Sequence, residues 1–239
     1  MNRRQLAGSG ELFTRSYRVF IGDFWTNLVF GLLMILPFTA MTWLLSHYAS
    51  IPVSRRPSLS SVVIGFMIVG LTALTIHSIA YITLISYTHN RVTEQNVVGQ
   101  NKNMLWNLGN AFDKLFSLWW IGILMSFWIL GGFLFFIIPG FIVATRLSLG
   151  SYVLVVENQH GLDALVKSRS LVRGYTFATL IRWIVPYLPL IIFGLIGYFL
   201  KQILPNTNEI ISEAVNVLVA PFAAIYGYFL YLELVSIPR

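Results

Sequence analysis

Cysteine is absent from this sequence of 239 residues, and histidine is rare. The lack of cysteine excludes disulfides, thiolate metal sites and cysteine nucleophiles. The four histidines lie far apart and form neither an HExxH nor a His-x-His motif. They are His47, His77, His89 and His160. We therefore predict no metal site and no cofactor.

Charged residues are also scarce, at 10% of the chain, against about 25% in an average soluble domain. They cluster between long apolar runs, a pattern that indicates a bilayer rather than a large soluble core. A net charge of +7 would suit nucleic acid, but the chain has no hydrophilic domain to present a basic patch. We expect membrane lipids, including anionic phospholipid, as partners, with a membrane protein or a second copy of the chain as a further one, and no nucleic acid.

Six apolar runs are each close to the roughly 20 residues that cross about 30 Å of hydrocarbon. They cover residues 24–47, 59–87, 117–137, 139–157, 176–200 and 210–236. The sequence therefore predicts an all-α polytopic integral membrane protein of about six transmembrane helices. Residues 1–23 form an N-terminal segment and residues 24–236 the transmembrane domain. The first run is too long for a signal peptide and no small-residue cleavage site follows it, so we expect it to be retained.

Pro139 and Gly140 separate the third and fourth runs without any polar residue. Proline lacks a backbone donor and glycine frees the backbone, so we predict a tight helical hairpin at this point. The alternative is one tilted helix of about 40 residues, which would far exceed the thickness of the bilayer.

Basic residues are divided unequally between the two sides that six spans define. Eleven lie on one side, namely Arg3, Arg4, Arg15, Arg18, Arg91, Lys102, Lys114, Lys167, Arg169, Arg173 and Arg239. Three lie on the other side, namely Arg55, Arg56 and Lys201. Because cytoplasmic loops carry the excess of lysine and arginine, we predict a multi-pass protein of the cell (inner) membrane with both termini in the cytoplasm.

The segment before the first run is amphipathic. On a helix, one stripe holds Glu11, Arg15, Arg18 and Gly22, and the opposite stripe holds Phe13, Tyr17, Phe20 and Phe24. A basic face with aromatic residues behind it is typical of a helix that lies in the membrane interface. The alternative is a cytoplasmic extension of the first span.

A shift of 152 residues pairs this segment with a later one. It aligns Glu11 with Asp163, Arg15 with Lys167, Ser16 with Ser168, Gly22 with Gly174 and Pro37 with Pro189. A weaker third copy starts at residues 111–114. We predict three units, each an interfacial amphipathic helix followed by a transmembrane hairpin. Chance is the alternative, because apolar sequences match one another readily, but the charge, glycine and proline matches favour a repeat.

A series of motifs extends from residue 138 to residue 174 and returns at the C-terminus. It consists of Ile138-Pro139-Gly140, Arg146, Val155-Val156-Glu157, Ala164-Leu165-x-x-Ser168-x-x-Leu171-x-x-Gly174 and Leu230-Tyr231-x-Glu233-Leu234. The pattern resembles the membrane domain fused to some bacterial glycerophosphoryl diester phosphodiesterases, which also occurs alone in six-span proteins and has Asp where this chain has Glu233. The resemblance implies six spans. It implies no phosphodiesterase activity, which belongs to a separate soluble barrel whose His-Arg pair this chain lacks.

Arg146 lies inside the fourth run. An intramembrane arginine costs at least about 2.5 kcal/mol to insert, so it needs a polar partner or a path for its side chain to the headgroups. We favour a structural role for Arg146, with binding of an anionic ligand as the alternative.

Four further residues complete the candidate polar site: Glu157, Ser168, Arg169 and Glu233. Glu157 ends the fourth run and is expected to pair with Lys167, Arg169 or Arg182, and the alternative is a solvated loop charge. Glu233 is expected to act as a structural latch against a basic loop. His77 lies near the middle of the second run, which contains no acidic residue, so we expect it to pack in the core rather than to relay protons.

Pro186 and Pro189 predict a kink or a break in the fifth run. Broken helices form transporter sites, but more often such kinks are structural. No carboxylate pair, serine–base pair or metal set is found at bilayer depth, so we do not predict an enzyme. We predict a non-enzymatic membrane scaffold or envelope-organising module, and the alternative is a protein that binds or transports a lipid or small amphiphile in a cavity near Arg146.

Overall fold

The computed structural model describes residues 8–52, 58–94, 104–200 and 207–237. Within these residues every regular element is a helix, and six helical stretches are long and apolar enough to cross a membrane. The predicted all-α fold of a polytopic membrane protein is confirmed.

The helices follow one another with short connections. The first half of the chain contains α1 (Ser9–Gly22), α2 (Phe24–Ser50), α3 (Leu59–Glu94) and α4 (Met104–Phe135). The second half contains α5 (Ile137–Leu147), α6 (Gly150–Glu157), α7 (Gly161–Val172), α8 (Thr176–Ile184), the 3-10 turn η2 (Val185–Tyr187), α9 (Leu188–Leu200) and α10 (Thr207–Val235).

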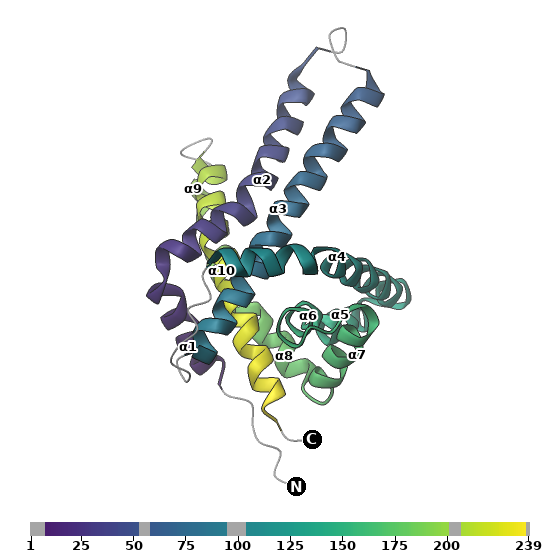
Figure 1. Cartoon of the computed structure of the whole chain (residues 1–239). Helices are drawn as coiled ribbons and strands as arrows, with labels where there is room; N and C mark the ends of the chain where they lie inside the picture. The colour runs from purple at the N-terminus through teal and green to yellow at the C-terminus, as the bar shows by residue number, and fades with distance from the viewer. Residues whose placement is uncertain (1–7, 53–57, 95–103, 201–206, 238–239) are drawn as a thin grey trace.

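Helix α10 runs through the middle of the molecule (Figure 1) and packs against α1, α2, α3 and α9. In its apolar window 67% of the residues are buried, against 17% or less for the spans of α2, α3 and α4. Tyr226, Tyr228 and Tyr231 of α10 and Tyr152 of α6 are the largest fully buried side chains. The core is therefore centred on α10, and the outer spans present apolar side chains to their surroundings, as lipid exposure requires.

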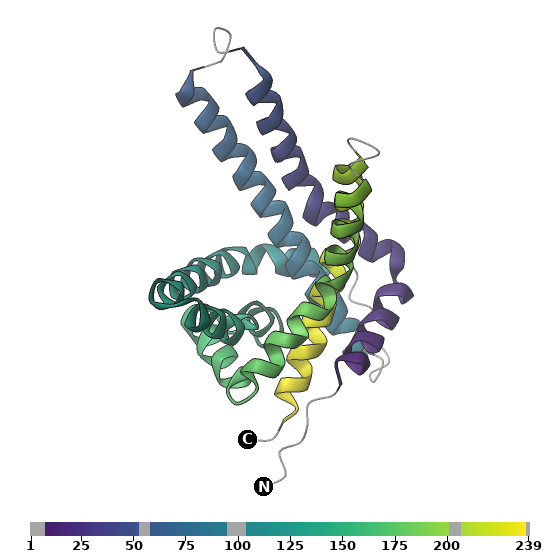
Figure 2. The same ribbon diagram turned by 180° about the vertical axis from the view of Figure 1, so that it is seen from behind.

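The remaining helices form two groups. Helices α2 and α3 run side by side as a long hairpin, and α4, α5, α6 and α7 gather in a second group, which meets the hairpin where α4 packs on α3 (Figures 1 and 2). Helix α3 has 36 residues, or about 54 Å at 1.5 Å per residue, which is much longer than the hydrocarbon thickness. Its last turns therefore extend beyond the predicted second span, and this extension creates the site described below.

The hairpin between the third and fourth spans turns at Phe136 rather than at Pro139 and Gly140. Phe136 has an extended backbone between α4 and α5. Pro139 lies in the first turn of α5. Backbone N–H groups in the first turn have no acceptor within the helix, so proline, which lacks an N–H, breaks no hydrogen bond there. Gly140 lies against Phe133 of α4, because an added Cβ would come within 2.5 Å of the ring. Proline and glycine thus permit the close packing of the hairpin but do not form its turn.

The predicted third unit has no separate interfacial helix. Residues 111–114 lie inside α4, which runs without a break from Met104 to Phe135. In contrast, α1 and α7 are separate helices before α2 and α8.

The first and second predicted units agree in structure at the same interval of 152 residues. Helices α1 and α7 begin at Ser9 and Gly161, and α2 and α8 begin at Phe24 and Thr176. The buried positions also correspond: Leu12 with Ala164, Ser16 with Ser168, Phe20 with Val172 and Asn27 with Thr179. These matches support the predicted relation between the two units.

The described chain places α1 and the C-terminal end of α10 at one end of the molecule, opposite the tip of the α2–α3 hairpin (Figure 1). The side that faces the cytoplasm stays a prediction. Seven of the basic residues on which it depends lie outside the described residues: Arg3, Arg4, Arg55, Arg56, Lys102, Lys201 and Arg239.

Site-directed labelling can test this arrangement, since the natural chain contains no cysteine. We expect Ser9→Cys and Asp163→Cys to react with a membrane-impermeant thiol reagent from the same side, and Ser58→Cys only from the other side. All three positions are exposed. Reaction of Ser9→Cys and Ser58→Cys from the same side would contradict the membrane crossings of α2 and α3.

Candidate functional site

Helix α1 is held against the bundle by one narrow face. Leu12, Ser16 and Phe20 are buried, and the Ser16 hydroxyl donates to the carbonyl of Leu12 at 2.8 Å. Phe222 of α10 makes edge-to-face contacts with Phe20 and with Phe13 of α1. This packing leaves the basic stripe of α1 outside the core, as the amphipathic pattern predicts. The aromatic residues do not form a single buried stripe, because Phe13 and Tyr17 are exposed.

The corner between α1 and α2 is fixed by two polar side chains. The amide of Asn27, which is buried, donates to the carbonyl of Phe20 at 2.8 Å and satisfies one of the free carbonyls at the end of α1. Asp23 lies at the corner itself and accepts two hydrogen bonds from Arg91 of α3, at 3.1 Å from Nε and 2.7 Å from Nη2. The α3 extension is thereby joined to α1 by a bidentate ion pair.

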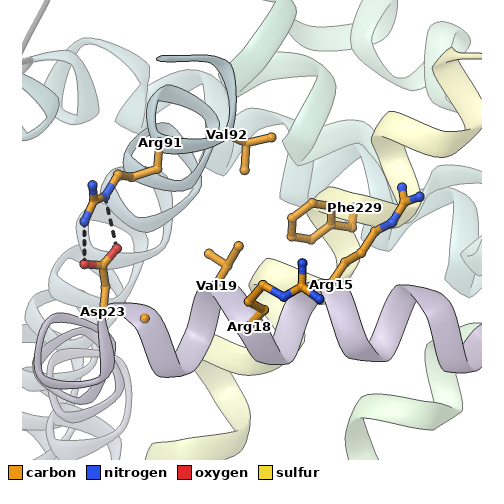
Figure 3. A pocket seen from close by; sticks show the side chains of 8 residues that line it. Arg15, Arg18, Val19, Asp23, Arg91, Val92 and Phe229 are labelled. Atoms are coloured by element: carbon orange, nitrogen blue, oxygen red, sulfur yellow. Dashed lines mark hydrogen bonds and ion pairs between the residues drawn. The ribbon is translucent and has the colours of Figure 1, made fainter. Parts of the chain in front are cut away.

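A pocket of about 320 Å³ opens between α1, the end of α3 and α10. Figure 3 shows Arg15 and Arg18 on α1 facing the space, with Arg91 and Val92 entering from α3 and Phe229 behind them. The pocket is lined by Arg15, Arg18, Val19, Gly22, Asp23, Arg91, Val92 and Phe229.

The charge of this pocket is strongly positive. Its lining contains three arginines and one aspartate, a formal balance of +2. Arg91 is engaged by Asp23, and Arg15 forms an ion pair with Glu11, one turn before it. Within the described part of the chain Arg18 has no such partner, so its five donors are available to an anion. Guanidinium groups bind phosphate and carboxylate through paired hydrogen bonds.

The pocket also has an apolar wall. Val19, Val92 and Phe229 line it beside the arginines. A site that combines two or three guanidinium groups with aliphatic and aromatic side chains suits an anionic headgroup and the first carbons attached to it.

Arg146, the predicted centre of the polar site, lies elsewhere and lines none of the cavities described here. It is half-buried at the end of α5, and its Nε donates to the hydroxyl of Thr176 at 3.3 Å. The contact is to a neighbouring helix, which agrees with the structural role favoured from the sequence.

Ser168 bridges a break in the fourth span that the sequence did not predict. The span is interrupted between α5 and α6 at Ser148 and Leu149. The Ser168 hydroxyl donates to the carbonyl of Arg146 at 2.8 Å and accepts from the N–H of Leu149 at 3.2 Å. One fully buried hydroxyl thus satisfies two backbone groups that the break leaves without helical partners.

Glu157 forms a polar cluster at the end of α6. Its carboxylate lies 3.5 Å from Lys167 of α7 and accepts a hydrogen bond of 2.7 Å from Tyr231 of α10. Lys114 of α4 donates to the carbonyl of Val155 at 2.7 Å in the same last turn. This cluster joins four helices, and its carboxylate and both of its lysines have partners within the protein, so its geometry is that of a structural latch.

The remaining predicted residues are dispersed. Arg169 is exposed on α7, and Glu233 is half-buried in the last turns of α10. Pro186 is buried within η2, and Pro189 follows in α9, so the fifth span contains a 3-10 turn where a kink was expected.

The sequence does not predict the arginine pocket as a site, although Arg15 and Arg18 share one stripe. The predicted second span ends before Arg91, whereas Arg91 lies within α3. The signal for this site in the sequence is Asp23, an acidic residue at the end of a basic amphipathic helix. Its partner Arg91 reaches it only because α3 extends to Glu94.

Comparison of the chain with protein-family models, with curated proteins and with solved structures finds no match. The resemblance of residues 138–174 to the phosphodiesterase-associated membrane domain therefore stays a prediction. No group of three or more acidic or histidine side chains that could hold a metal ion occurs among the residues that the structure describes.

Proposed function

We propose that this integral membrane protein is a non-enzymatic module that holds an anionic phospholipid at the cytoplasmic membrane surface. The observation that carries the proposal is the pocket in which Arg15, Arg18 and Arg91 line one space beside an apolar wall. On this proposal the phosphate binds Arg18 and Arg15, and the glycerol and upper acyl carbons lie against Val19 and Phe229.

The position of α1 supports this proposal. The helix packs on α10 through Leu12, Ser16 and Phe20 and exposes Phe13 and Tyr17 beside its arginines. Exposed aromatic residues next to basic residues are typical of a helix at the headgroup level. Binding of a headgroup there would join α1, α3 and α10 to the lipid surface, which is the kind of contact that an envelope-organising module needs.

The alternative site near Arg146 is less suited to this role. The side chain of Arg146 donates to Thr176, and the hydroxyl of the neighbouring Ser168 is hydrogen-bonded to the backbone carbonyl of Arg146. The Arg146 region thus shows one guanidinium group with a protein partner. The pocket gathers three guanidinium groups, and that of Arg18 has no ion-pair partner among the described residues.

Lipid retention can test the proposal. We expect the double variant Arg15→Gln/Arg18→Gln to retain phosphatidylglycerol about 30-fold less well than the natural protein, because each basic residue near the surface contributes about 1 kcal/mol. The measurement is native mass spectrometry of protein purified in detergent and mixed with equal amounts of phosphatidylglycerol and phosphatidylcholine.

The matched control is Arg169→Gln/Arg173→Gln, which removes two exposed arginines outside the pocket. This control should retain phosphatidylglycerol as the natural protein does. Asp23→Asn should retain more, because it releases Arg91 for the ligand. Equal losses in the two double variants would show general surface attraction and would overturn the proposal.

A further inference from the structure

A second cavity, of about 330 Å³, lies between the membrane spans. All of its lining residues belong to five of the six candidate spans. Most are apolar or aromatic, and the polar ones are neutral: His77, Tyr81, Trp183, Tyr187, Tyr152 and Asn216. No charged side chain lines it, in contrast to the arginine pocket. A ligand of this cavity therefore carries no charge, because a buried charge without a partner is costly at this depth.

The cavity has identifiable structural causes. On α10 its wall includes Ala220, Ala223 and Ala224, whose small side chains leave space between the helices. On the facing side the fifth span deviates at η2, where Trp183 and Tyr187 enter the wall. Tyr187 is 41% exposed, which places it at the mouth of the cavity rather than in its interior.

Hydrogen bonds within the protein define what two of the polar groups can offer a ligand. Nδ1 of His77 lies 3.1 Å from the carbonyl oxygen of Met34, which can only accept. Nδ1 therefore carries a proton, and Nε2 is an acceptor in the tautomer that this contact selects. The hydroxyl of Tyr81 is already paired with Ser151 at 3.0 Å.

Asn216 and Tyr187 are the polar residues of the cavity that make no such pairing with the described residues, and Tyr187 lies at the mouth. The side chain of Asn216 is half-buried in the apolar span of α10, and its amide makes no hydrogen bond to any residue that the structure describes. Leaving an amide without a partner in hydrocarbon costs free energy that a bound hydroxyl can offset. The side-chain amide of Asn216 can donate a hydrogen bond to an alcohol oxygen or accept one from an alcohol hydroxyl.

We infer that this cavity binds a neutral lipid alcohol. The hydroxyl group bonds with Asn216 and donates to His77, and the hydrocarbon chain lies along the alanines of α10 and leaves past Tyr187. The volume of the cavity supports this ligand, because about 330 Å³ holds a hydroxyl headgroup and the first part of a hydrocarbon chain rather than a whole lipid. The inference does not rest on the proposed binding of phospholipid, since the two sites share no residue.

Three probes of equal chain length can test the inference: oleyl alcohol, its methyl ether and oleate. A photoactivatable oleyl alcohol with a diazirine in the chain is bound to the purified full-length protein, and cross-linked peptides are mapped. We expect cross-links to residues 216–224 and to residues 183–190, and competition by oleyl alcohol about tenfold better than by the ether or by oleate. The ether cannot donate, and a lost hydrogen bond of this kind weakens binding by about that factor.

Four variants complete the test. Asn216→Leu should weaken the binding of oleyl alcohol and of its ether alike, because both can accept from the Asn216 amide. His77→Leu should lose the preference for alcohol over ether, because Nε2 of His77 accepts the hydrogen bond that the ether cannot donate. Ala220→Leu should reduce cross-linking by filling the cavity. Arg15→Gln/Arg18→Gln should leave the cross-linking unchanged, which separates this site from the arginine pocket. Equal competition by the three probes, cross-links outside the cavity, or an unchanged preference for alcohol over ether in His77→Leu would each overturn the inference.

Discussion

Gly31→Ala should lower the unfolding temperature of the detergent-solubilised protein by about 6–12 °C, which corresponds to about 3 kcal/mol for a chain of this size. Gly31 lies in α2 where this helix crosses α10. A Cβ at this position would overlap the carbonyl oxygen of Val217 and lie 2.9 Å from its carbonyl carbon and 3.3 Å from Pro221. Backbone atoms cannot move aside as a flexible side chain can, so the two helices would have to separate.

The sequence of α10 explains why this contact exists. Pro221 has no N–H, so the carbonyl of Val217, four residues earlier, lacks its helical donor. In a bilayer a carbonyl oxygen without a donor needs a partner. Because Gly31 has no side chain, α2 can approach until the Cα hydrogens of Gly31 lie near the carbonyl oxygen of Val217. The close approach thus depends on a proline in one helix and a glycine in the other.

Gly65→Ala is the matched control for Gly31→Ala. Gly65 also lies in a long membrane helix, α3, and an added Cβ there meets nothing within 4 Å. The control should keep or slightly raise the unfolding temperature, since alanine is the better helix former. Equal effects at Gly31 and Gly65 would contradict the contact between α2 and α10.

Gly227→Ala should destabilise the protein to a similar degree, by about 3 kcal/mol, through contacts with side chains. Its Cβ would overlap the hydroxyl of Tyr152 and lie 2.6 Å from Trp183. Neither ring is free to move, because Tyr152 donates to the carbonyl of Ala224 at 3.1 Å and the Trp183 indole donates to Ser148 at 3.0 Å. A shift of either ring therefore breaks a hydrogen bond in the core.

Gly122→Ala serves as the control for Gly227→Ala, because Gly122 lies in α4 with open space around it. Chemical unfolding monitored by tryptophan fluorescence provides the measurement for both. A Gly227→Ala protein as stable as Gly122→Ala would show that α10 is not packed against α6 and α8 as described.

Several features of the fold could be predicted from local sequence. The six spans follow from the lengths of the apolar runs, and the amphipathic α1 follows from the spacing of its charged residues. The pairing of Glu157 with a basic residue of α7 was also expected, because Lys167 lies within ten residues of it along the chain. In these cases the interacting groups are close in sequence or share the periodicity of one helix.

Other features depended on contacts between distant segments. No proline or glycine marks the break at Ser148 and Leu149, and Gly150 already belongs to α6. The break is stabilised by Ser168, which lies about twenty residues later in the chain. The same holds for Arg91, whose contact with Asp23 spans 68 positions of the chain. A scan of apolar runs cannot detect either contact.

The membrane character of the chain and its six candidate spans can be predicted from the sequence, because transfer into hydrocarbon depends on the composition of each segment and on bilayer thickness. Which polar groups come into contact depends on the tertiary structure. The arginine pocket requires α3 to extend to Glu94 and α1 to pack on α10, and the neutral cavity requires the alanines of α10 to face η2. These contacts depend on where the helices cross. Small residues and prolines allow close crossings at a few positions. Apolar side chains do not specify the crossings, because they are equally stable against lipid and against another helix.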